Sequence, residues 1–274
     1  MVFRRSGKGG KSMNRIAATF NKLKEQNKKA FISFVTAGDP TLKDTYELIL
    51  LMEKNGVDII EIGVPFSDPM AEGPVIQRAN IRALKNDINV DKIFEMVSKL
   101  REITQIPIIY LLYYNSILSY GSKVFFERCA NSGVDGLIIP DLPYEEKEEL
   151  TDISKETGVN LISMVSPTSK DRIKTICKEA EGFVYCVSSL GVTGTRSEFK
   201  TDFDSFIGEV KASTKMPAAI GFGISNAKQA SELKKYADGI IIGSAIVRLM
   251  EENLEGDYKG KVGEFVSSVR QALD

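Results

Sequence analysis

IIEIGVPFSDPMAEGPVIQ, residues 59–77, joins an apolar run to a loop that carries carboxylates. The glycines and prolines from Gly63 onward prevent any regular element until after Pro74. Glu61 therefore lies at a strand end, and Asp68 and Glu72 lie on the loop beyond it. Acids brought together from a rigid strand and a mobile loop suit proton transfer. A solvated loop with an acid capping the next helix fits the same spacing.

Seven further apolar, β-branched runs accompany this one along the chain. The predicted strands are residues 31–36, 58–63, 107–113, 136–140, 160–165, 183–187, 218–220 and 239–242. Amphipathic stretches of helical period lie between them, at 41–55, 91–104, 123–132, 145–157, 171–179, 202–213 and 226–236, and a leading helix is expected at about 14–26. Eight such units predict a single (β/α)8 TIM barrel domain over residues 13–274, with an extra N-terminal helix. A doubly wound open sheet is the alternative, although the first strand lacks a Gly-rich dinucleotide turn.

Repeated turn phrases support the alternation of strands and helices. NGVD ends at Asp58, SGVD ends at Asp135 and ADG ends at Gly239, each just before a strand. A helix must stop and turn at these points. These phrases are therefore interpreted as turns and not as parts of an active site.

Composition excludes several classes of function. Lys and Arg number 36 against 37 Asp and Glu, so no global field favours nucleic acid or an anionic membrane. No apolar stretch reaches the roughly 18 to 20 residues that span a bilayer, which predicts a soluble, cytoplasmic protein. The chain has no histidine, so no histidine-based triad or base is available, and no metal site is expected. Cys129, Cys177 and Cys186 are expected to be reduced thiols.

The first twelve residues, MVFRRSGKGGKS, are basic and rich in glycine. Their ending resembles a phosphate-binding P-loop, but Arg5 stands where that motif needs glycine and no strand precedes it. Residues 1–12 are expected to be a disordered extension, an upstream start or a cloning remnant.

The active site of such a barrel lies at the C-terminal ends of the strands. Strand alternation places Ile59 and Glu61 on one face and Ile60 and Ile62 on the other. If the second pair faces the helices, Glu61 points into the barrel mouth beside aromatic rings. Such surroundings would raise the pKa of Glu61 and let it donate and accept a proton near neutrality. A carboxylate in a buried ion pair is the alternative.

Three glycine clusters, at residues 191–194, 221–223 and 243–244, follow the last three predicted strands. Glycine lets backbone N–H groups approach an anion, and Ser244 would begin the last crossover helix, where the helix dipole favours phosphate. A phosphate pocket is therefore predicted. The loop over residues 188–200 could close as a lid, with an ordinary flexible loop as the alternative.

Eight motifs together resemble the tryptophan synthase α subunit family. They are FVTAGDP (34–40), EIGVPFSDP (61–69), GPVIQ (73–77), YYN (113–115), DLP (141–143), GVTG (191–194), GFGIS (221–225) and GSAIV (243–247). Their order and spacing match from about Met13 to the C-terminus. The resemblance implies a carbon–oxygen lyase of tryptophan biosynthesis. Such an enzyme cleaves indole-3-glycerol phosphate to indole and glyceraldehyde 3-phosphate by a retro-aldol reaction.

The resemblance also implies a role for individual residues. Glu61 matches the acid/base glutamate, and Glu72 falls where the family has an aspartate that accepts the indole N–H. Phe34, Leu111, Tyr113 and Tyr185 fall on indole-pocket or adjacent positions, Thr193 on the lid threonine that contacts the second carboxylate, and Gly194, Gly223, Gly243 and Ser244 on phosphate-binding positions. Ser116 departs from the proline that many relatives have after YYN.

Glu72 is the departure from the family pattern that bears on catalysis. Its extra methylene lengthens the side chain by ~1.5 Å. A misplacement of about 1 Å can cost on the order of 10²-fold in rate. The sequence thus predicts a working lyase that the longer side chain could slow, and in that case Glu72→Asp would raise kcat.

The resemblance further implies a partner, the pyridoxal-phosphate-dependent β subunit, in an α2β2 heterotetramer. Pro65, Asp68, Pro69 and Asn115 match the contact region. The cofactor is expected on the β subunit and none on this chain. Two alternatives remain open: a free-standing indole-3-glycerol-phosphate lyase, and a catalytically impaired α subunit that mainly activates the β subunit.

Overall fold

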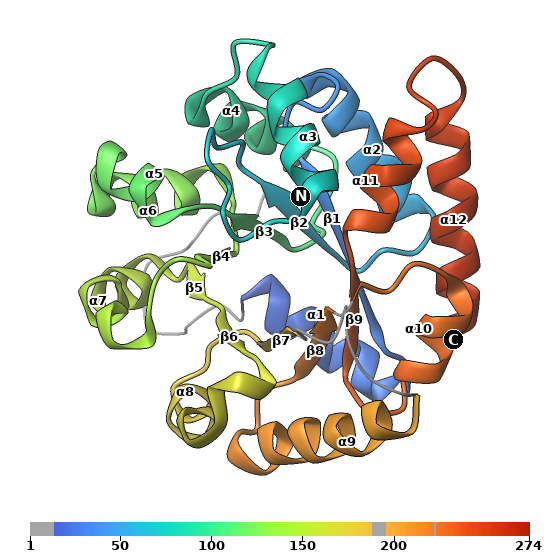
Figure 1. Cartoon of the computed structure of the whole chain (residues 1–274). Coiled ribbons are helices and arrows are strands. Elements are labelled where there is room, and N and C mark those ends of the chain that lie inside the picture. The colour runs from blue at the N-terminus through green and yellow to red at the C-terminus, as the bar shows by residue number, and fades with distance from the viewer. Residues whose placement is uncertain (1–13, 188–195, 222) are drawn as a thin grey trace.

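The computed structural model describes residues 14–187, 196–221 and 223–274, so residues 1–12 lie outside it. Parallel strands form one sheet in the order β5-β4-β3-β2-β1-β9-β8-β7-β6. They are β1 (Ala30–Thr36), β2 (Ile59–Gly63), β3 (Ile108–Leu111), β4 (Gly136–Ile138), β5 (Asn160–Leu161), β6 (Ser163–Val165), β7 (Val184–Val187), β8 (Ala218–Gly221) and β9 (Gly239–Ile242). Only Ile162 separates the two end strands, β5 and β6, along the chain. The sheet is therefore a nearly closed ring inside a ring of helices, and the predicted (β/α)8 barrel is confirmed (Figure 1).

The fifth predicted strand, residues 160–165, is divided into two. Its first half, β5, pairs with β4, and its second half, β6, pairs with β7. The N–H of Ile162 still donates to the carbonyl of Leu137 at 2.9 Å. The backbone thus changes its hydrogen-bonding partner at this residue, and the prediction of one continuous strand was wrong.

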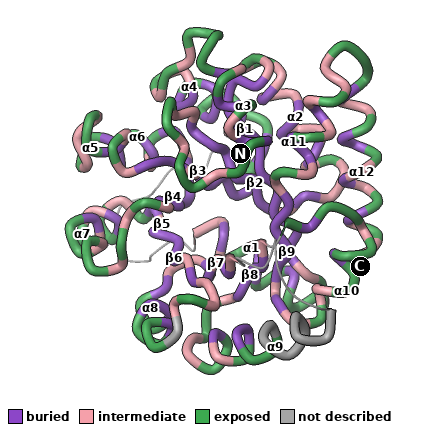
Figure 2. Tube along the Cα trace, in the orientation of Figure 1, coloured by how far each residue is buried: buried purple, intermediate pink, exposed green. Residues whose placement is uncertain are grey.

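Helices cover the outer face of the sheet. They are α2 (Leu42–Lys54), α3 (Pro74–Leu84), α4 (Val90–Leu100), α5 (Tyr114–Tyr120), α6 (Ser122–Ser132), α7 (Glu148–Thr157), α8 (Ile173–Lys178), α9 (Arg196–Ser213), α10 (Ala227–Leu233), α11 (Ser244–Glu251) and α12 (Tyr258–Leu273), with short 3₁₀ helices at Tyr144–Glu146 and Pro167–Arg172. The strands are buried and the outer helix faces are exposed (Figure 2). Helix α3 begins at Pro74, where the missing N–H is tolerated. Helices α3, α5 and α12 were not among the predicted helical stretches.

Two apolar layers hold the barrel together. Ile60 and Ile62 pack with the helices, whereas Ile59 faces the barrel interior. This confirms the alternation predicted for the second strand. The interior layer is continued by Ile16 and Phe20 of the leading helix α1 (Arg15–Glu25), which lies across the ring (Figure 1). The predicted extra N-terminal helix therefore covers the N-terminal ends of the strands.

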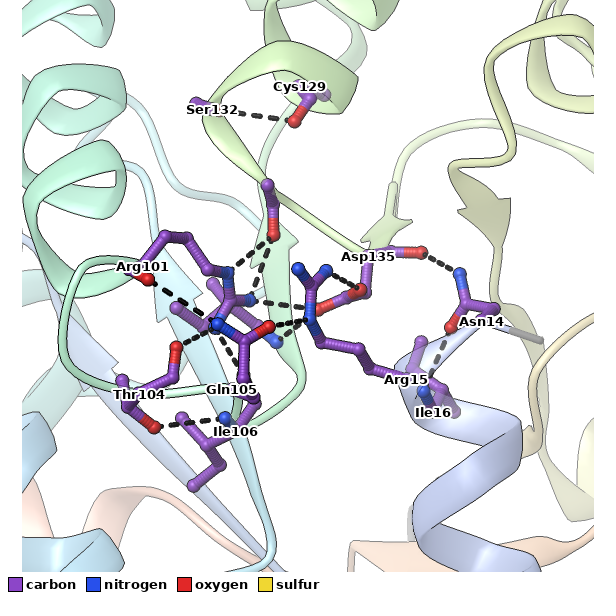
Figure 3. Close-up of polar contacts among 12 residues, drawn as sticks. Asn14, Arg15, Ile16, Arg101, Thr104, Gln105, Ile106, Cys129, Ser132 and Asp135 are labelled. Atoms are coloured by element: carbon purple, nitrogen blue, oxygen red, sulfur yellow. Dashed lines mark hydrogen bonds and ion pairs between the residues drawn. The ribbon is translucent and has the colours of Figure 1, made fainter. Parts of the chain in front are cut away.

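A buried polar network fixes α1 to this end of the barrel (Figure 3). Asp135, just before β4, is only 4% exposed. Its carboxylate accepts hydrogen bonds from Arg15, Arg101 and the N–H of Ile108, each at 2.9 Å. Its carbonyl accepts from the Asn14 side chain at 3.0 Å. The same aspartate thus joins α1, the loop after α4 and the start of β3.

The three cysteines, Cys129, Cys177 and Cys186, are buried free thiols, as predicted. None of the helices in the described ranges combines the length and the apolar character that a membrane span needs.

Candidate active site

A cavity of about 510 Å³ opens at the C-terminal ends of the strands. Its lining residues are Phe34, Glu61, Ala71, Glu72, Gly73, Ile76, Leu111, Pro140, Met164, Tyr185, Val187, Gly221, Gly223, Ile224, Ser225, Ile241, Gly243, Ser244, Ala245 and Arg248. The structure thus brings most of the sequence-predicted site residues to one cavity. Thr193 and Gly194, with most of the predicted lid, lie outside the described residues.

Glu61 is held in β2, with Phe34 of β1 on one side and Ile109 of β3 on the other. It is 1% exposed, and its Oε1 atom has no hydrogen-bond partner among the described residues. Burial raises the pKa of Glu61 to about 8, so the side chain is a neutral acid at pH 7. No cation in the described part of the chain pairs with it, which argues against the ion-pair alternative.

Tyr185 lies close enough to Glu61 for their charges to interact. Burial raises the pKa of Tyr185 well above its usual range, and the charge of Glu61 adds to this shift. The expectation of an aromatic ring beside Glu61 is thus met by a neutral phenol.

Glu72 is half-buried on the loop that precedes α3. Its carboxylate accepts a short hydrogen bond from the hydroxyl of Tyr113. The same hydroxyl accepts from the N–H of Ala71 at 2.8 Å, and the Tyr113 ring stacks on Phe66 with centroids 4.8 Å apart. Burial raises the pKa of Glu72, and the bond from Tyr113 opposes that shift. One tyrosine therefore holds the loop at Phe66, at Ala71 and at Glu72.

Tyr113 differs from its sequence-based placement in one respect. β3 ends at Leu111, two residues short of the prediction, because Tyr113 is already the N-cap of α5. Leu111 lines the cavity, whereas Tyr113 lies behind Glu72.

The opposite end of the cavity is built from glycine turns. Gly223 has a φ of +60°, a left-handed conformation that suits glycine. A Cβ atom at Gly243 would lie 3.1 Å from the Cβ of Phe34, so the chain passes very close to that side chain. Ser244 is the first residue of α11, where unpaired N–H groups and the helix dipole favour an anion. This end can therefore bind phosphate.

Met164 and Arg248 are among the cavity residues that sequence reasoning missed. Met164 lies in β6 on the inward face, and strand alternation could have found it. Arg248 lies four residues after Ser244 in α11, a spacing that places both on one helix face.

The predicted partner-contact residues lie outside the cavity. Pro65, Asp68 and Pro69 are on the loop after β2, and Asn115 is an exposed residue of α5. Met70, on the same loop, is 83% exposed. The described residues contain no group of acidic or cysteine side chains placed to hold a metal ion.

Comparisons with known proteins agree on one family. The family model of the tryptophan synthase alpha chain matches residues 20–272. The chain is 51% identical over 243 residues to the tryptophan synthase alpha chain of Alkaliphilus metalliredigens, covering 89% of this chain and 91% of that one. It is 48% identical over 262 residues to that of Caldanaerobacter subterraneus, covering 95% of this chain and 100% of the relative.

Solved structures give the same result. Tryptophan synthase subunit alpha from Legionella pneumophila superposes with a TM-score of 0.89 at 38% identity, covering 96% of this chain and 99% of that one. A chain of Mycobacterium tuberculosis tryptophan synthase superposes with a TM-score of 0.86 at 31% identity, covering 96% and 99%. The chain therefore belongs to the tryptophan synthase alpha chain family and is a lyase of tryptophan biosynthesis that cleaves indole-3-glycerol phosphate.

Proposed function

We propose that Glu61 is the acid and the base of this cleavage and that Glu72 accepts the indole N–H. The observation that carries the proposal is the state of Glu61, a neutral buried acid with an unpartnered oxygen in a cavity whose other end suits phosphate. Gly223, Gly243 and Ser244 would hold the phosphate, with Gly194. Thr193 would contact Glu72 from the lid.

The proton transfers follow from these positions. Glu61 donates its proton to the ring carbon that carries the glycerol phosphate chain, and positive charge develops at the ring nitrogen. Glu72 stabilises that charge by accepting the N–H. The Glu61 carboxylate then takes the proton of the adjacent side-chain hydroxyl. The bond between ring and side chain breaks, its electron pair returns to the ring, and the hydroxyl carbon becomes the aldehyde of glyceraldehyde 3-phosphate.

The apolar wall of the cavity would hold the indole ring. Phe34, Leu111 and Tyr185 lie on the inner faces of β1, β3 and β7, and Met164 of β6 faces the same space. Such a wall excludes water from Glu61 and keeps its carboxyl neutral until the substrate accepts the proton.

Tyr113 is expected to be a positioning residue for Glu72. Tyr113→Phe removes the hydroxyl that bonds Glu72 and Ala71 but keeps the ring that stacks on Phe66. A hydrogen bond to a charged group contributes about 1.5–3 kcal/mol, so kcat should fall by about tenfold or more. The substrate KM should change less, because the N–H bond to Glu72 strengthens as the transition state forms. Steady-state indole release measures both constants.

Tyr114→Phe is the matched control for this variant. Tyr114 donates to Glu149 at 2.9 Å on the outside of the barrel and, within the described ranges, makes no hydrogen bond with Glu72. Its kcat should stay within about twofold of the parent, as is usual for surface changes. Equal kcat in the parent and the Tyr113→Phe variant would contradict the positioning role.

A double-mutant cycle links this role to the unexpected glutamate. Because Tyr113 reaches the longer side chain, Glu72→Asp is now expected to lower kcat, the reverse of the sequence-based expectation. If both residues act through one contact, Glu72→Asp should add little in the Tyr113→Phe background. A gain in kcat for Glu72→Asp would show that the extra methylene limits the rate.

We also propose that the chain assembles with the β subunit as an α2β2 heterotetramer, in which the β subunit carries the pyridoxal phosphate. Tryptophan synthase from Mycobacterium tuberculosis is among the similar structures. Tyr113, at the start of α5, contacts the loop that carries Pro65, Asp68, Pro69 and Met70. The loop and the helix therefore lie side by side, which supports a single contact surface formed by both.

Leu118 is expected to belong to this surface. It lies three residues after Asn115 in α5, on the same helix face, and is 52% exposed. Leu118→Asp should weaken binding of the β subunit by about tenfold or more, since an apolar contact is replaced by a desolvated charge. Val124→Asp on α6, also 52% exposed, is the control and should bind as the parent does. Sedimentation of the mixed subunits measures both, and equal binding by the two variants would place the interface elsewhere.

A further inference from the structure

The ionisable side chains that line the cavity include more acids than cations. Glu61 and Glu72 line it as acids, and Arg248 is the one cationic side chain among its described lining residues. A phosphate monoester carries about −1.5 to −2 charges at pH 7. Backbone N–H groups and a serine hydroxyl supply hydrogen bonds to such a group but no net positive charge. The substrate's dianion therefore enters a cavity in which a single described residue can offset its charge.

Arg248 is placed to meet the phosphate. It lies four residues after Ser244 in α11, and both side chains line the cavity. Side chains of an α-helix point back toward its N-terminus, so the Arg248 stem is directed toward the turn that begins with Ser244. Ile246, Val247 and Met250 occupy the buried face of the same helix and fix its orientation.

The guanidinium of Arg248 is also available for a ligand. Arg82 pairs with Asp39 and Glu251 at 2.8 and 2.6 Å, and Arg78 pairs with Glu251 at 2.7 Å. Glu251, three residues after Arg248, is thus taken by these two arginines of α3. Arg248 makes no ion pair or side-chain hydrogen bond with any residue of the described ranges. An exposed arginine that no acid neutralises, at the rim of an anion site, keeps its full charge for the anion.

We propose that Arg248 recognises the phosphate dianion of the substrate and sets the preference of this lyase for phosphorylated substrates. The inference rests on the proposed phosphate site and adds its charge-bearing residue. A guanidinium binds phosphate through two parallel N–H bonds. The phosphate does not react, so Arg248 contributes equally to the binding of the substrate and of the transition state.

The test compares Arg248→Gln with the parent in steady-state cleavage of indole-3-glycerol phosphate. We expect KM to rise by about tenfold or more with kcat within about twofold, the pattern of lost uniform binding. Inorganic phosphate and glycerol 3-phosphate, used as competitive inhibitors, should bind more weakly to the same degree. Inhibition by indole, which lacks phosphate, should not change. In the parent, inhibition by inorganic phosphate should strengthen as the dianion forms above about pH 6, and this gain should be smaller in the variant.

Lys228→Gln is the matched control. Lys228 is an exposed cation in the first turn of α10, next to the Gly223 turn, and it does not line the cavity. Its KM should equal that of the parent. An equal rise in KM for both variants would attribute the effect to the general field of the surface and overturn the proposal, as would an unchanged KM for Arg248→Gln.

Ser244→Ala separates this inference from the proposed phosphate site. If glycerol 3-phosphate binds more weakly to Ser244→Ala but normally to Arg248→Gln, the phosphate site stands and the role of Arg248 is refuted. If neither variant changes the inhibition, the phosphate site itself fails. Urea unfolding of Arg248→Gln should match the parent, because the side chain is exposed.

Discussion

Glu61→Gln is expected to reduce kcat for cleavage of indole-3-glycerol phosphate by at least about 10³-fold, because in the proposed mechanism one residue serves both proton transfers. The amide keeps the size of the side chain but can neither give up an acid proton nor take one from the substrate hydroxyl. Indole release, measured with and without the β subunit, gives the rate. A kcat within about tenfold of the parent would remove Glu61 from the acid/base role.

The pH dependence of the parent provides a second readout of the same residue. The proposed first step needs Glu61 protonated, and burial raises its pKa to about 8. The value of kcat/KM, which reports the free enzyme, should therefore fall by about tenfold per pH unit above this pKa. An alkaline limb near pH 8 supports Glu61 as the acid. A flat profile through pH 9 would contradict it.

Stability provides the control for loss of activity by unfolding. The folded-state pKa of Glu61 is raised, so the folded protein holds a proton between about pH 4.5 and 8 that the unfolded chain releases. Its contribution to stability is therefore greatest at low pH and is lost as the pH rises, at about 1.4 kcal/mol per pH unit. The Glu61→Gln variant lacks this pH dependence of the free energy of unfolding. From pH 5 to 8, it should therefore lose less stability than the parent in urea unfolding. The variant should also leave tryptophan synthesis from added indole intact in the α–β complex.

Local sequence patterns were sufficient for the parts of the site that depend on strand alternation. Glu61 alternates with Ile60 and Ile62, which fixes its face as soon as the outer layer is known. Glycine turns after strands could be predicted equally well, since Gly223 lies two residues after β8 and Gly243 follows β9 directly. These features depend on neighbours in the chain.

Contacts between distant segments could not be predicted in this way. Tyr113 and Glu72 are separated by 41 positions, and their hydrogen bond depends on how the loop before α3 folds over α5. No periodicity of the sequence predicts such a contact. The change of partner at Ile162 is similar, because the residues of β5 and β6 are ordinary strand formers and only the closure of the ring divides them.

The repeated turn phrases have a structural role beyond turning the chain. Asp58, Asp135 and Asp238 each accept a hydrogen bond from the first N–H groups of a neighbouring strand, at Phe31, Ile108 and Ala218. The distances are 2.8, 2.9 and 3.0 Å. The barrel thus uses the same carboxylate-to-backbone hydrogen bond at three places to join the starts of neighbouring strands, at the end of the barrel opposite the cavity. Only Asp135 is also bonded to two arginines.

Asp135→Ala is expected to lower the free energy of unfolding by about 3–5 kcal/mol, the usual cost of removing one partner from a buried ion pair. Burial lowers the pKa of Arg101 to about 10 although the Asp135 carboxylate opposes this shift, so the guanidinium is charged at pH 7 and the substitution leaves it buried without that partner. The N–H of Ile108 also loses its acceptor, and Arg15 no longer ties α1 to the barrel. Urea unfolding at pH 7, followed by circular dichroism, measures the loss.

Asp238→Ala separates the cost of the buried ion pair from the cost of the shared carboxylate-to-backbone hydrogen bond. Asp238 accepts the N–H of Ala218 but has no ion pair within the described ranges, so its loss should cost only about 1–3 kcal/mol. Both variants should keep the parent's kcat at temperatures where they are folded, because the aspartates lie at the end of the barrel opposite Glu61. Equal destabilisation by the two substitutions would mean that the arginines add nothing and that α1 is held by its apolar face alone. A reduced kcat in folded Asp135→Ala would instead show that α1 controls the geometry of β2 through the barrel interior.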